Sequence, residues 1–384
     1  MPYGAIEPPW ARMAAKSARA RALRFDLMRS QNHSVPAPRE TNAHAIRDPR
    51  LECALLAAAR GAQVARVVLS WPDGRHCESK PDGSPVSAAD LAIQIAVTWT
   101  IRERFGDREP IVGEEGASSV SMPGGRALLD RAVRALRDAF GASGPRDPEA
   151  MLLEESTLTP ESWPRDWWTI DPIDGTKGFR SGRHFAICVA RVEASVPTVG
   201  ALSCPTMPRS GDAMAMQPAG DSGTLYGALA GAGAWSLDAN SFPGSAACAV
   251  RLARPSDRAS QRGEGSPWIV CDSIEGGDRA ERMRGVVSRA GFPWTTISLD
   301  SQCKYALVAD GRADAFMRVP SAKGRSETAW DHVAGLVICA EAGAFAGDLD
   351  GAAVRCAHGP DLTQSRGVLA CDRAIADSIV RAAS

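Results

Sequence analysis

A short apolar run at residues 167–176 ends in two carboxylates, a glycine and a hydroxyl, and it reads WWTIDPIDGT. Its first four residues are aromatic or β-branched, and such residues favour a buried strand. Pro172 has no N–H to donate to a neighbouring strand, so we expect the strand to end at Asp171. The chain then turns through Asp174 and Gly175. An isolated Asp-Gly turn carries no function, but two carboxylates three residues apart on such a turn can converge on one cation.

The length and composition describe a globular chain with room for more than one domain. The chain has 384 residues and a formal net charge of -1, which gives no reason to expect a surface for nucleic acid polymers. No apolar run approaches the roughly 20 residues that span a bilayer, so we expect no membrane partner. The ten cysteines form no C-x-x-C pair. Several of them lie in apolar segments, which indicates buried thiols in a reducing compartment.

Residues 1–48 do not have the pattern of a folded core. Basic residues lie among alanines and serines with few acids before Glu40, as in an organellar transit peptide. Glu7 and Asp26 are untypical of such a peptide, so a disordered extension or a misplaced start codon fits equally well. The sequence therefore leaves the cytoplasm, or a chloroplast or mitochondrion, as the location.

Residues 49–235 have the pattern of an α+β domain. One apolar stripe at 51–69 predicts an amphipathic helix packed on the core. Ser87 can cap a second helix that runs to about Phe105, and Asp90 stands three residues after this cap. Taken alone, Asp90 is the acidic member of a capping box. A further helix is expected at 127–140, and further strands at 111–112, 185–192, 200–205 and 224–230.

Residues 236–384 predict a second domain of the α/β type, because strands and helices alternate after about residue 268. The last long helix is expected at 329–342. Thr328 can cap it, and Asp331 again stands three residues on. The N-terminal end of a helix presents free N–H groups that suit a phosphate, and an aspartate there can hold a cation that itself holds the phosphate.

Acidic residues recur in four of these segments. Five negative charges cannot share one site without cations, because their repulsion would raise the pKa values or unfold the site. Ligands that are all oxygens, and that leave room for phosphate and water, select magnesium over zinc or copper. Paired ions about 4 Å apart fit the hydrolysis of a phosphate ester. The candidate ligands are Glu114, Asp171, Asp174 and Asp331, with Asp90 as a possible fifth.

Together these segments resemble the lithium-sensitive, magnesium-dependent phosphomonoesterases related to inositol monophosphatase. The resemblance covers roughly residue 51 to the C-terminus and rests on four motifs: SPV at 84–86 followed by Asp90, GEE at 113–115, DPIDGT at 171–176 and WDHVAG at 330–335. Two longer motifs are similar to the 3'(2'),5'-bisphosphate nucleotidase branch of that family, DPIDGTKGF at 171–179 and LDSQCKY at 299–305.

The resemblance implies a layered αβαβα sandwich, with two or three magnesium ions bound between the two domains. It assigns the metal to Glu114, Asp171, the carbonyl of Ile173, Asp174 and Asp331. It assigns the orientation and deprotonation of the attacking water to Asp90 and Thr176. It places phosphate oxygens on the backbone of Gly175 and Thr176, and the nucleotide on Ser301, Lys304, Arg318 and Asp331.

The reaction that the resemblance implies is removal of the 3'-phosphate from adenosine 3',5'-bisphosphate, with 3'-phosphoadenylyl sulfate as a further candidate substrate. One departure leaves the substrate open: the branch usually carries a His-Ser-Ser-His run after the strand at 268–271, and this chain reads SIEGGDRAE at 273–281. Acids there disfavour a phosphorylated ligand unless Arg279 offsets them. An inositol (poly)phosphate 1-phosphatase is the alternative enzyme, and a sensor of phosphorylated nucleotides is the alternative without catalysis. The sequence does not fix the oligomeric state.

Overall fold

The computed structural model describes residues 46–152, 162–209, 211, 223–240, 242, 248–253, 265–274, 276–321 and 326–384. Residues 43–384 form one compact unit. The predicted targeting or disordered extension at 1–48 lies outside the described residues except for its last three. Within the described ranges, every helix is too short or too polar to cross a membrane.

A seven-stranded sheet occupies the first part of this unit, in the order β3-β4-β5-β6-β7-β8-β9. Strand β3 pairs in parallel with β4, and all the other neighbours in this sheet pair antiparallel. The strands are β3 (Ile111–Gly113), β4 (Trp167–Asp174), β5 (Ala186–Glu193), β6 (Val196–Cys204), β7 (Thr224–Leu229), β8 (Gly233–Asp238) and β9 (Val250–Leu252).

A five-stranded sheet follows, in the order β11-β10-β12-β14-β13. Strand β10 pairs in parallel with β11 and β12, and β14 pairs antiparallel with β12 and β13. The strands are β10 (Trp268–Asp272), β11 (Trp294–Ser298), β12 (Ala315–Arg318), β13 (Phe345–Gly347) and β14 (Val368–Cys371).

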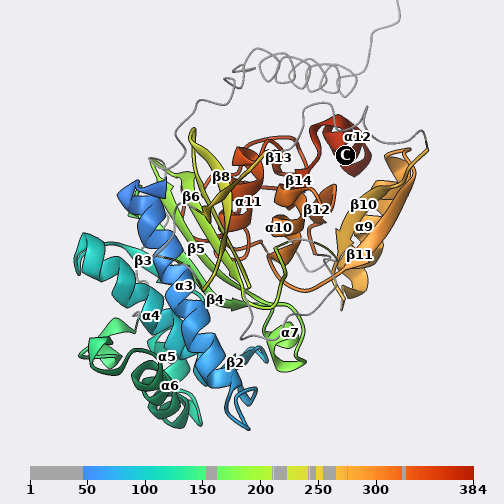
Figure 1. Cartoon of the computed structure of the whole chain (residues 1–384). Helices are drawn as coiled ribbons and strands as arrows, with labels where there is room; N and C mark the ends of the chain where they lie inside the picture. The colour runs from blue at the N-terminus through green and yellow to red at the C-terminus, as the bar shows by residue number, and fades with distance from the viewer. Residues whose placement is uncertain are drawn as a thin grey trace, which may run out of the picture. The chain divides into compact units, whose positions relative to one another are not determined.

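Helices separate and cover the two sheets (Figure 1). One core cluster joins α3 (Pro49–Leu69), α4 (Ala88–Phe105) and α6 (Gly125–Phe140) to one face of the first sheet. A second cluster contains α10 (Cys303–Asp310), α11 (Val333–Glu341) and residues from both sheets, so these two helices form the middle layer. A third joins α9 (Gly277–Arg289) and α12 (Arg373–Ala383) to the outer face of the second sheet. The layers therefore follow the predicted αβαβα order.

The remaining elements are short connections around the first sheet. They comprise the hairpin β1 (Cys77–Ser79) and β2 (Pro85–Ser87), the helices α5 (Ala117–Ser121) and α7 (Thr176–Arg180), and the 3-10 turns η1 (Gly141–Ser143) and η2 (Glu149–Met151). The predicted helices at 51–69, 87–105 and 127–140 are confirmed. Strands β8 and β9 both belong to the first sheet although they extend beyond residue 235, and the division into domains at that residue stays a prediction.

Two predicted boundaries are wrong. Strand β4 does not end at Asp171 but runs to Asp174, and its register with β5 shifts between these two residues. Pro172 lies inside this irregular step, where no ladder hydrogen bond is required of it. The last long helix begins at Val333 rather than at residue 329. The cap position is occupied by His332, so Thr328 does not cap this helix, and its hydroxyl instead donates to Asp331 Oδ2 at 2.5 Å.

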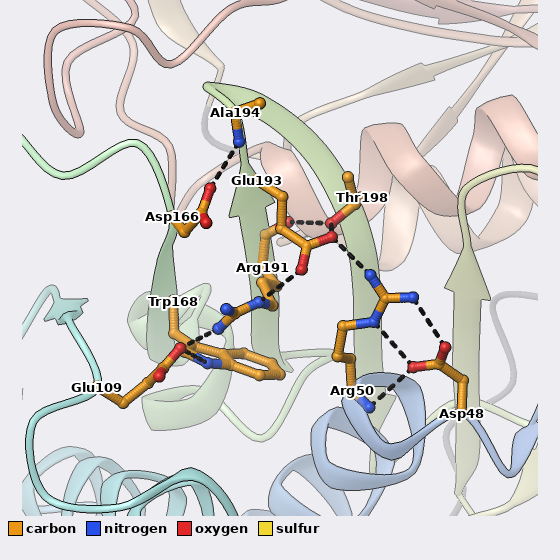
Figure 2. A network of polar contacts seen from close by, with 9 residues as sticks. All are labelled: Asp48, Arg50, Glu109, Asp166, Trp168, Arg191, Glu193, Ala194 and Thr198. Carbon is orange, nitrogen blue, oxygen red and sulfur yellow. Dashed lines mark hydrogen bonds and ion pairs between the residues drawn. The ribbon is translucent and has the colours of Figure 1, made fainter.

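A chain of ion pairs ties the C-terminal end of β5 in the first sheet to the start of α3 (Figure 2). Arg191 on β5 pairs with Glu109, and its Nε lies 3.0 Å from Glu193 Oε1. The other oxygen of Glu193 lies 2.7 Å from Arg50 Nη1 at the start of α3. Arg191 also lies over the Trp168 ring, 5.1 Å from its centroid, and the Trp168 indole N–H donates to Glu109 at 3.1 Å. Arg191 therefore contacts two carboxylates and two aromatic rings, those of Trp168 and Phe105.

Replacing Arg191 with methionine removes the cation and keeps most of the aliphatic stem. We expect the free energy of unfolding to fall by about 2–3 kcal/mol, because Glu109 and Glu193 would be left half-buried without their shared partner. Urea unfolding measures the change. The matched control is Arg104→Met, since Arg104 is 53% exposed and 4.0 Å from Glu52. Equal stability of the two variants would contradict this role of Arg191.

Candidate active site

A cavity of about 320 Å³ opens where the end of β4 meets the loops that precede α10 and α11. It brings together eight of the residues singled out from the sequence, namely Glu114, Asp174, Gly175, Thr176, Ser301, Lys304, Arg318 and Asp331. The other three, Asp90, Asp171 and Ile173, are buried and do not line it. One wall of the cavity is therefore acidic and another carries cations.

Three carboxylates converge beside this cavity. One oxygen each of Asp171, Asp174 and Asp331 lies within 4.8 Å of the other two. In a regular strand, residues three apart point to opposite faces, so the register shift at the end of β4 allows Asp171 and Asp174 to reach the same point. Asp171 Oδ1 is buried and has no hydrogen-bond partner among the described residues. This oxygen is available to a cation.

Several carboxylates of this site have raised pKa values, so their charged forms are favoured only beside a positive charge. Burial, and then the charge of Glu115, raises the pKa of Glu114 to about 8. Burial, and then the charge of Asp331, raises the pKa of Asp174 to about 7. Burial and the neighbouring carboxylates also raise the pKa of Asp171 well above its usual range. A set of carboxylate oxygens in this state fits a hard divalent cation.

Lys80 offsets part of this negative charge, and the sequence patterns do not predict that role. Its ammonium pairs with Glu115 and lies 3.7 Å from Glu114 Oε1. Glu115 is itself buried and accepts a hydrogen bond from Ser119 at 2.5 Å. The two adjacent glutamates thus differ: Glu114 lines the cavity, and Glu115 anchors Lys80. The feature of the sequence that could have indicated this role is a lysine at the start of the Lys-Pro-Asp-Gly loop, which comes shortly before Asp90 in the chain.

Asp90 and Thr176 each have a local partner. Asp90 Oδ2 accepts hydrogen bonds from the N–H and hydroxyl of Ser87, at 2.8 and 2.6 Å, so the predicted capping box is present. Burial, and then the charge of Glu115, raises the pKa of Asp90 to about 7. The Thr176 hydroxyl donates to the carbonyl of Ile173 at 3.2 Å. The use of one water by Asp90 and Thr176 stays a prediction.

Gln302 joins the three segments that build the site. Its backbone N–H donates to Asp174, and its side-chain amide donates to the carbonyl of Trp330 at 2.7 Å. The amide oxygen accepts from Gly335 N at 3.1 Å. The backbone of Gln302 therefore fixes the end of β4 to the start of α10, and its side chain fixes α11 and the loop before it. Its place directly before an apolar helix is the feature of the sequence that could have pointed to it.

The loops around Gly175 and Ser301 pack closely against each other. Gly175 has φ +89°, and a Cβ there would lie 2.8 Å from Ser301 Cβ. Ser301 itself has φ +68°. A larger residue at position 175 would push the two loops apart, so glycine is required where the predicted phosphate contact begins.

Comparison with known proteins agrees with this geometry. The inositol monophosphatase family matches residues 47–384. The chain belongs to this family. A 3'(2'),5'-bisphosphate nucleotidase of Emericella nidulans is 32% identical over 324 residues, covering 79% of this chain and 89% of that protein. A 3',5'-bisphosphate nucleotidase of Arabidopsis thaliana is 29% identical over 330 residues, covering 79% and 86%.

Solved structures of the family have the same fold. The Thermotoga maritima IMPase superposes with a TM-score of 0.55 at 20% identity, over 87% of this chain and 96% of that one. CysQ from Bacteroides thetaiotaomicron, a bacterial family member, gives 0.54 at 18% identity, over 84% and 97%. The family and the layered fold predicted from the sequence are confirmed. The roles of individual residues stay predictions.

The raised pKa values give a prediction for the metal-free protein. With a chelator present, the free energy of unfolding should fall as the pH rises from about 4.5 to about 8, because folded Glu114 keeps a proton that the unfolded chain releases near its ordinary pKa. Below that pH window Glu114 is protonated in both the folded and the unfolded state, so its ionisation does not lower the free energy of unfolding. Added Mg²⁺ should reverse the loss, and Asp174→Asn should flatten the slope. Thermal unfolding against pH measures this, and a chelated protein that gains stability across the window contradicts it.

Proposed function

We propose that this member of the inositol monophosphatase family is a magnesium-dependent phosphomonoesterase that converts adenosine 3',5'-bisphosphate to AMP and phosphate. The observation that carries the proposal is a single cavity with a carboxylate cluster for a metal-bound phosphate and two cations, Lys304 and Arg318, for a second phosphate. The named relatives from Emericella and Arabidopsis are bisphosphate nucleotidases, which supports this substrate class. 3'-Phosphoadenylyl sulfate carries the same 3'-phosphate and is the second candidate substrate.

The metal is assigned to the acidic wall. Asp171, Asp174 and Asp331, with Glu114 and the carbonyl of Ile173, would hold two or three magnesium ions. Bound there, the ions supply a water of lowered pKa and neutralise charge on the leaving oxygen. The buried Asp171 Oδ1, which has no hydrogen-bond partner among the described residues, supports the assignment.

The protein's own groups orient and deprotonate the water. The Thr176 hydroxyl orients it, and a carboxylate oxygen of Asp90 accepts its proton. A pKa of about 7 suits Asp90 to this task, since a general base works best when its pKa lies near the operating pH. The backbone N–H groups of Gly175 and Thr176 hold the phosphate oxygens at the start of α7.

The alternative enzyme is an inositol (poly)phosphate 1-phosphatase. It is favoured by one observation, the sequence SIEGGDRAE at 273–281 in place of the His-Ser-Ser-His run of the nucleotidase branch. A polyphosphorylated inositol also carries a second anion for Lys304 and Arg318.

A phosphate-release panel tests the proposal. Purified protein with Mg²⁺ is given adenosine 3',5'-bisphosphate, 3'-phosphoadenylyl sulfate, inositol 1-phosphate and inositol 1,4-bisphosphate, with and without lithium. We expect the highest kcat/KM with the adenosine bisphosphate, and inhibition by lithium. Faster release from the inositol phosphates would establish the alternative, and tight binding without release would establish a sensor.

Lys304→Met tests the contact with the remote phosphate. The Lys304 side chain is buried, its ammonium 3.3 Å from the carbonyl of Leu299 and 5.2 Å from the centre of the Phe316 ring. Methionine keeps the volume and removes the charge. We expect KM for the bisphosphate to rise about tenfold or more, with a smaller change in kcat. A loss confined to kcat would mean that Lys304 acts on the reacting phosphate instead.

A further inference from the structure

A second cavity, of about 180 Å³, adjoins the first. The two share Ser273, Phe316 and Arg318 as lining residues. The second cavity lies between the end of β10, the start of α9 and β12, and its wall, which is polar and apolar in about equal parts, adds Arg279 to the shared residues. Arg318 therefore stands on the common wall, where it can reach a ligand that occupies either space.

A buried carboxylate holds both arginines at this wall. Glu327 is 7% exposed, and its two oxygens lie 2.8 and 3.2 Å from the two Nη atoms of Arg279. Its Oε2 also lies 3.4 Å from Arg318 Nε and 3.2 Å from His332 Nε2. His332 is fixed in turn by the Tyr305 hydroxyl, 2.9 Å from its Nδ1. One carboxylate thus orients two guanidinium groups.

The charges around this point are not balanced within the protein. Arg279 and Arg318 contribute two cations, and Glu327 is the carboxylate set between them, while Lys304 faces the acidic wall of the first cavity. Asp272 also lines the second cavity, but its oxygens are engaged by Arg284 at 2.6 Å and by the N–H of Ser273 at 2.7 Å. The surplus of positive charge matches a phosphate, which carries close to two negative charges at neutral pH.

Arg279 keeps donors for a ligand. A guanidinium has five N–H groups, and the hydrogen bond from Nη1 to Glu327 Oε2 accounts for one of them, while Nη2 forms an ion pair with Oε1. Its side chain is 22% exposed and that of Arg318 is 37% exposed, so both can be reached from solvent. An arginine already fixed by a carboxylate loses less rotamer freedom when it binds a phosphate.

Arg279 also lies in a distinctive segment of the chain. It lies within SIEGGDRAE at 273–281, the segment that departs from the His-Ser-Ser-His run of the nucleotidase branch. Helix α9 begins at Gly277, so its first turn carries Arg279 to the cavity wall, while Asp278 is exposed. The segment that made the substrate uncertain in the sequence supplies an extra cation in the structure.

We propose that Arg279 is a specificity-determining residue that binds the non-scissile phosphate of the substrate together with Arg318, and that Glu327 is the positioning residue for both. The inference rests on the proposed function, because it requires a substrate with a second phosphate. It assigns the 5'-phosphate of the nucleotide to the wall shared by the two cavities.

Arg279→Met, assayed with two substrates, tests the inference. Adenosine 3',5'-bisphosphate carries the second phosphate, and adenosine 3'-monophosphate lacks it. We expect kcat/KM for the bisphosphate to fall about 10- to 100-fold, mainly through KM, and kcat/KM for the monophosphate to change less than about threefold. Arg282→Met is the matched control, because Arg282 is exposed on the same helix. Glu327→Gln should repeat the pattern of Arg279→Met, and Arg279→Lys should restore part of the loss.

A binding measurement separates this inference from the proposed function. Calorimetry with Mg²⁺ and AMP, which keeps the 5'-phosphate, should show weaker binding to Arg279→Met than to the wild-type protein, with adenosine binding unchanged. If the wild-type protein hydrolyses the bisphosphate but Arg279→Met loses both substrates equally, or loses neither, the role of Arg279 is refuted and the proposed function stands. If the wild-type protein releases no phosphate from the bisphosphate, both fall together.

Discussion

The mutual repulsion of buried carboxylates is the constraint on which the rest of this structure depends. Asp171 and Asp174 lie three residues apart at the end of β4, Asp331 comes from a distant segment of the chain, and burial raises the pKa values of Asp171 and Asp174 above the usual range of a carboxyl group. In the absence of a cation, protonation and interactions elsewhere in the fold hold them there. The register shift in β4, the amide of Gln302 and the ammonium of Lys80 supply those interactions. A cation bound among these carboxylates, as the proposed function requires, would remove their repulsion.

The layered fold explains how such distant segments meet. Helices α10 and α11 lie between the two sheets, so each contributes apolar side chains to a core that both sheets share. The loops before these helices reach the end of β4, and there Gln302 links all three. The chemistry is therefore carried by loops and element ends, and its geometry is set by the packing of the middle layer.

The sequence predicts many of the helices and strands and the acidic residues because helical stripes, apolar strands and short acidic motifs are local signals, whereas the layers and the residues Ser301, Lys304 and Arg318 follow only from the resemblance to the family. It does not predict the register shift at Pro172. A proline inside a strand is tolerated where the pairing with the neighbouring strand is irregular, and the local sequence does not show which strand is the neighbour. Lys80, Gln302 and Glu327 are missed for a related reason: each acts through a contact with residues distant in sequence. Asp90 presents a different difficulty: its sequence pattern is local, but the same pattern fits both a helix-capping residue and a catalytic residue.

The position of Arg318 on the wall shared by the two cavities bears on how substrates are selected. Strand β4 carries the carboxylates in one sheet and β12 carries Arg318 in the other, with the helical layer between them. The spacing between the carboxylates and the guanidinium is therefore set by the thickness of packed helices. If the proposed function holds, such a cavity would select substrates by the distance between their two anionic groups, and it would tolerate a change in the group that joins them more readily than a change in their separation.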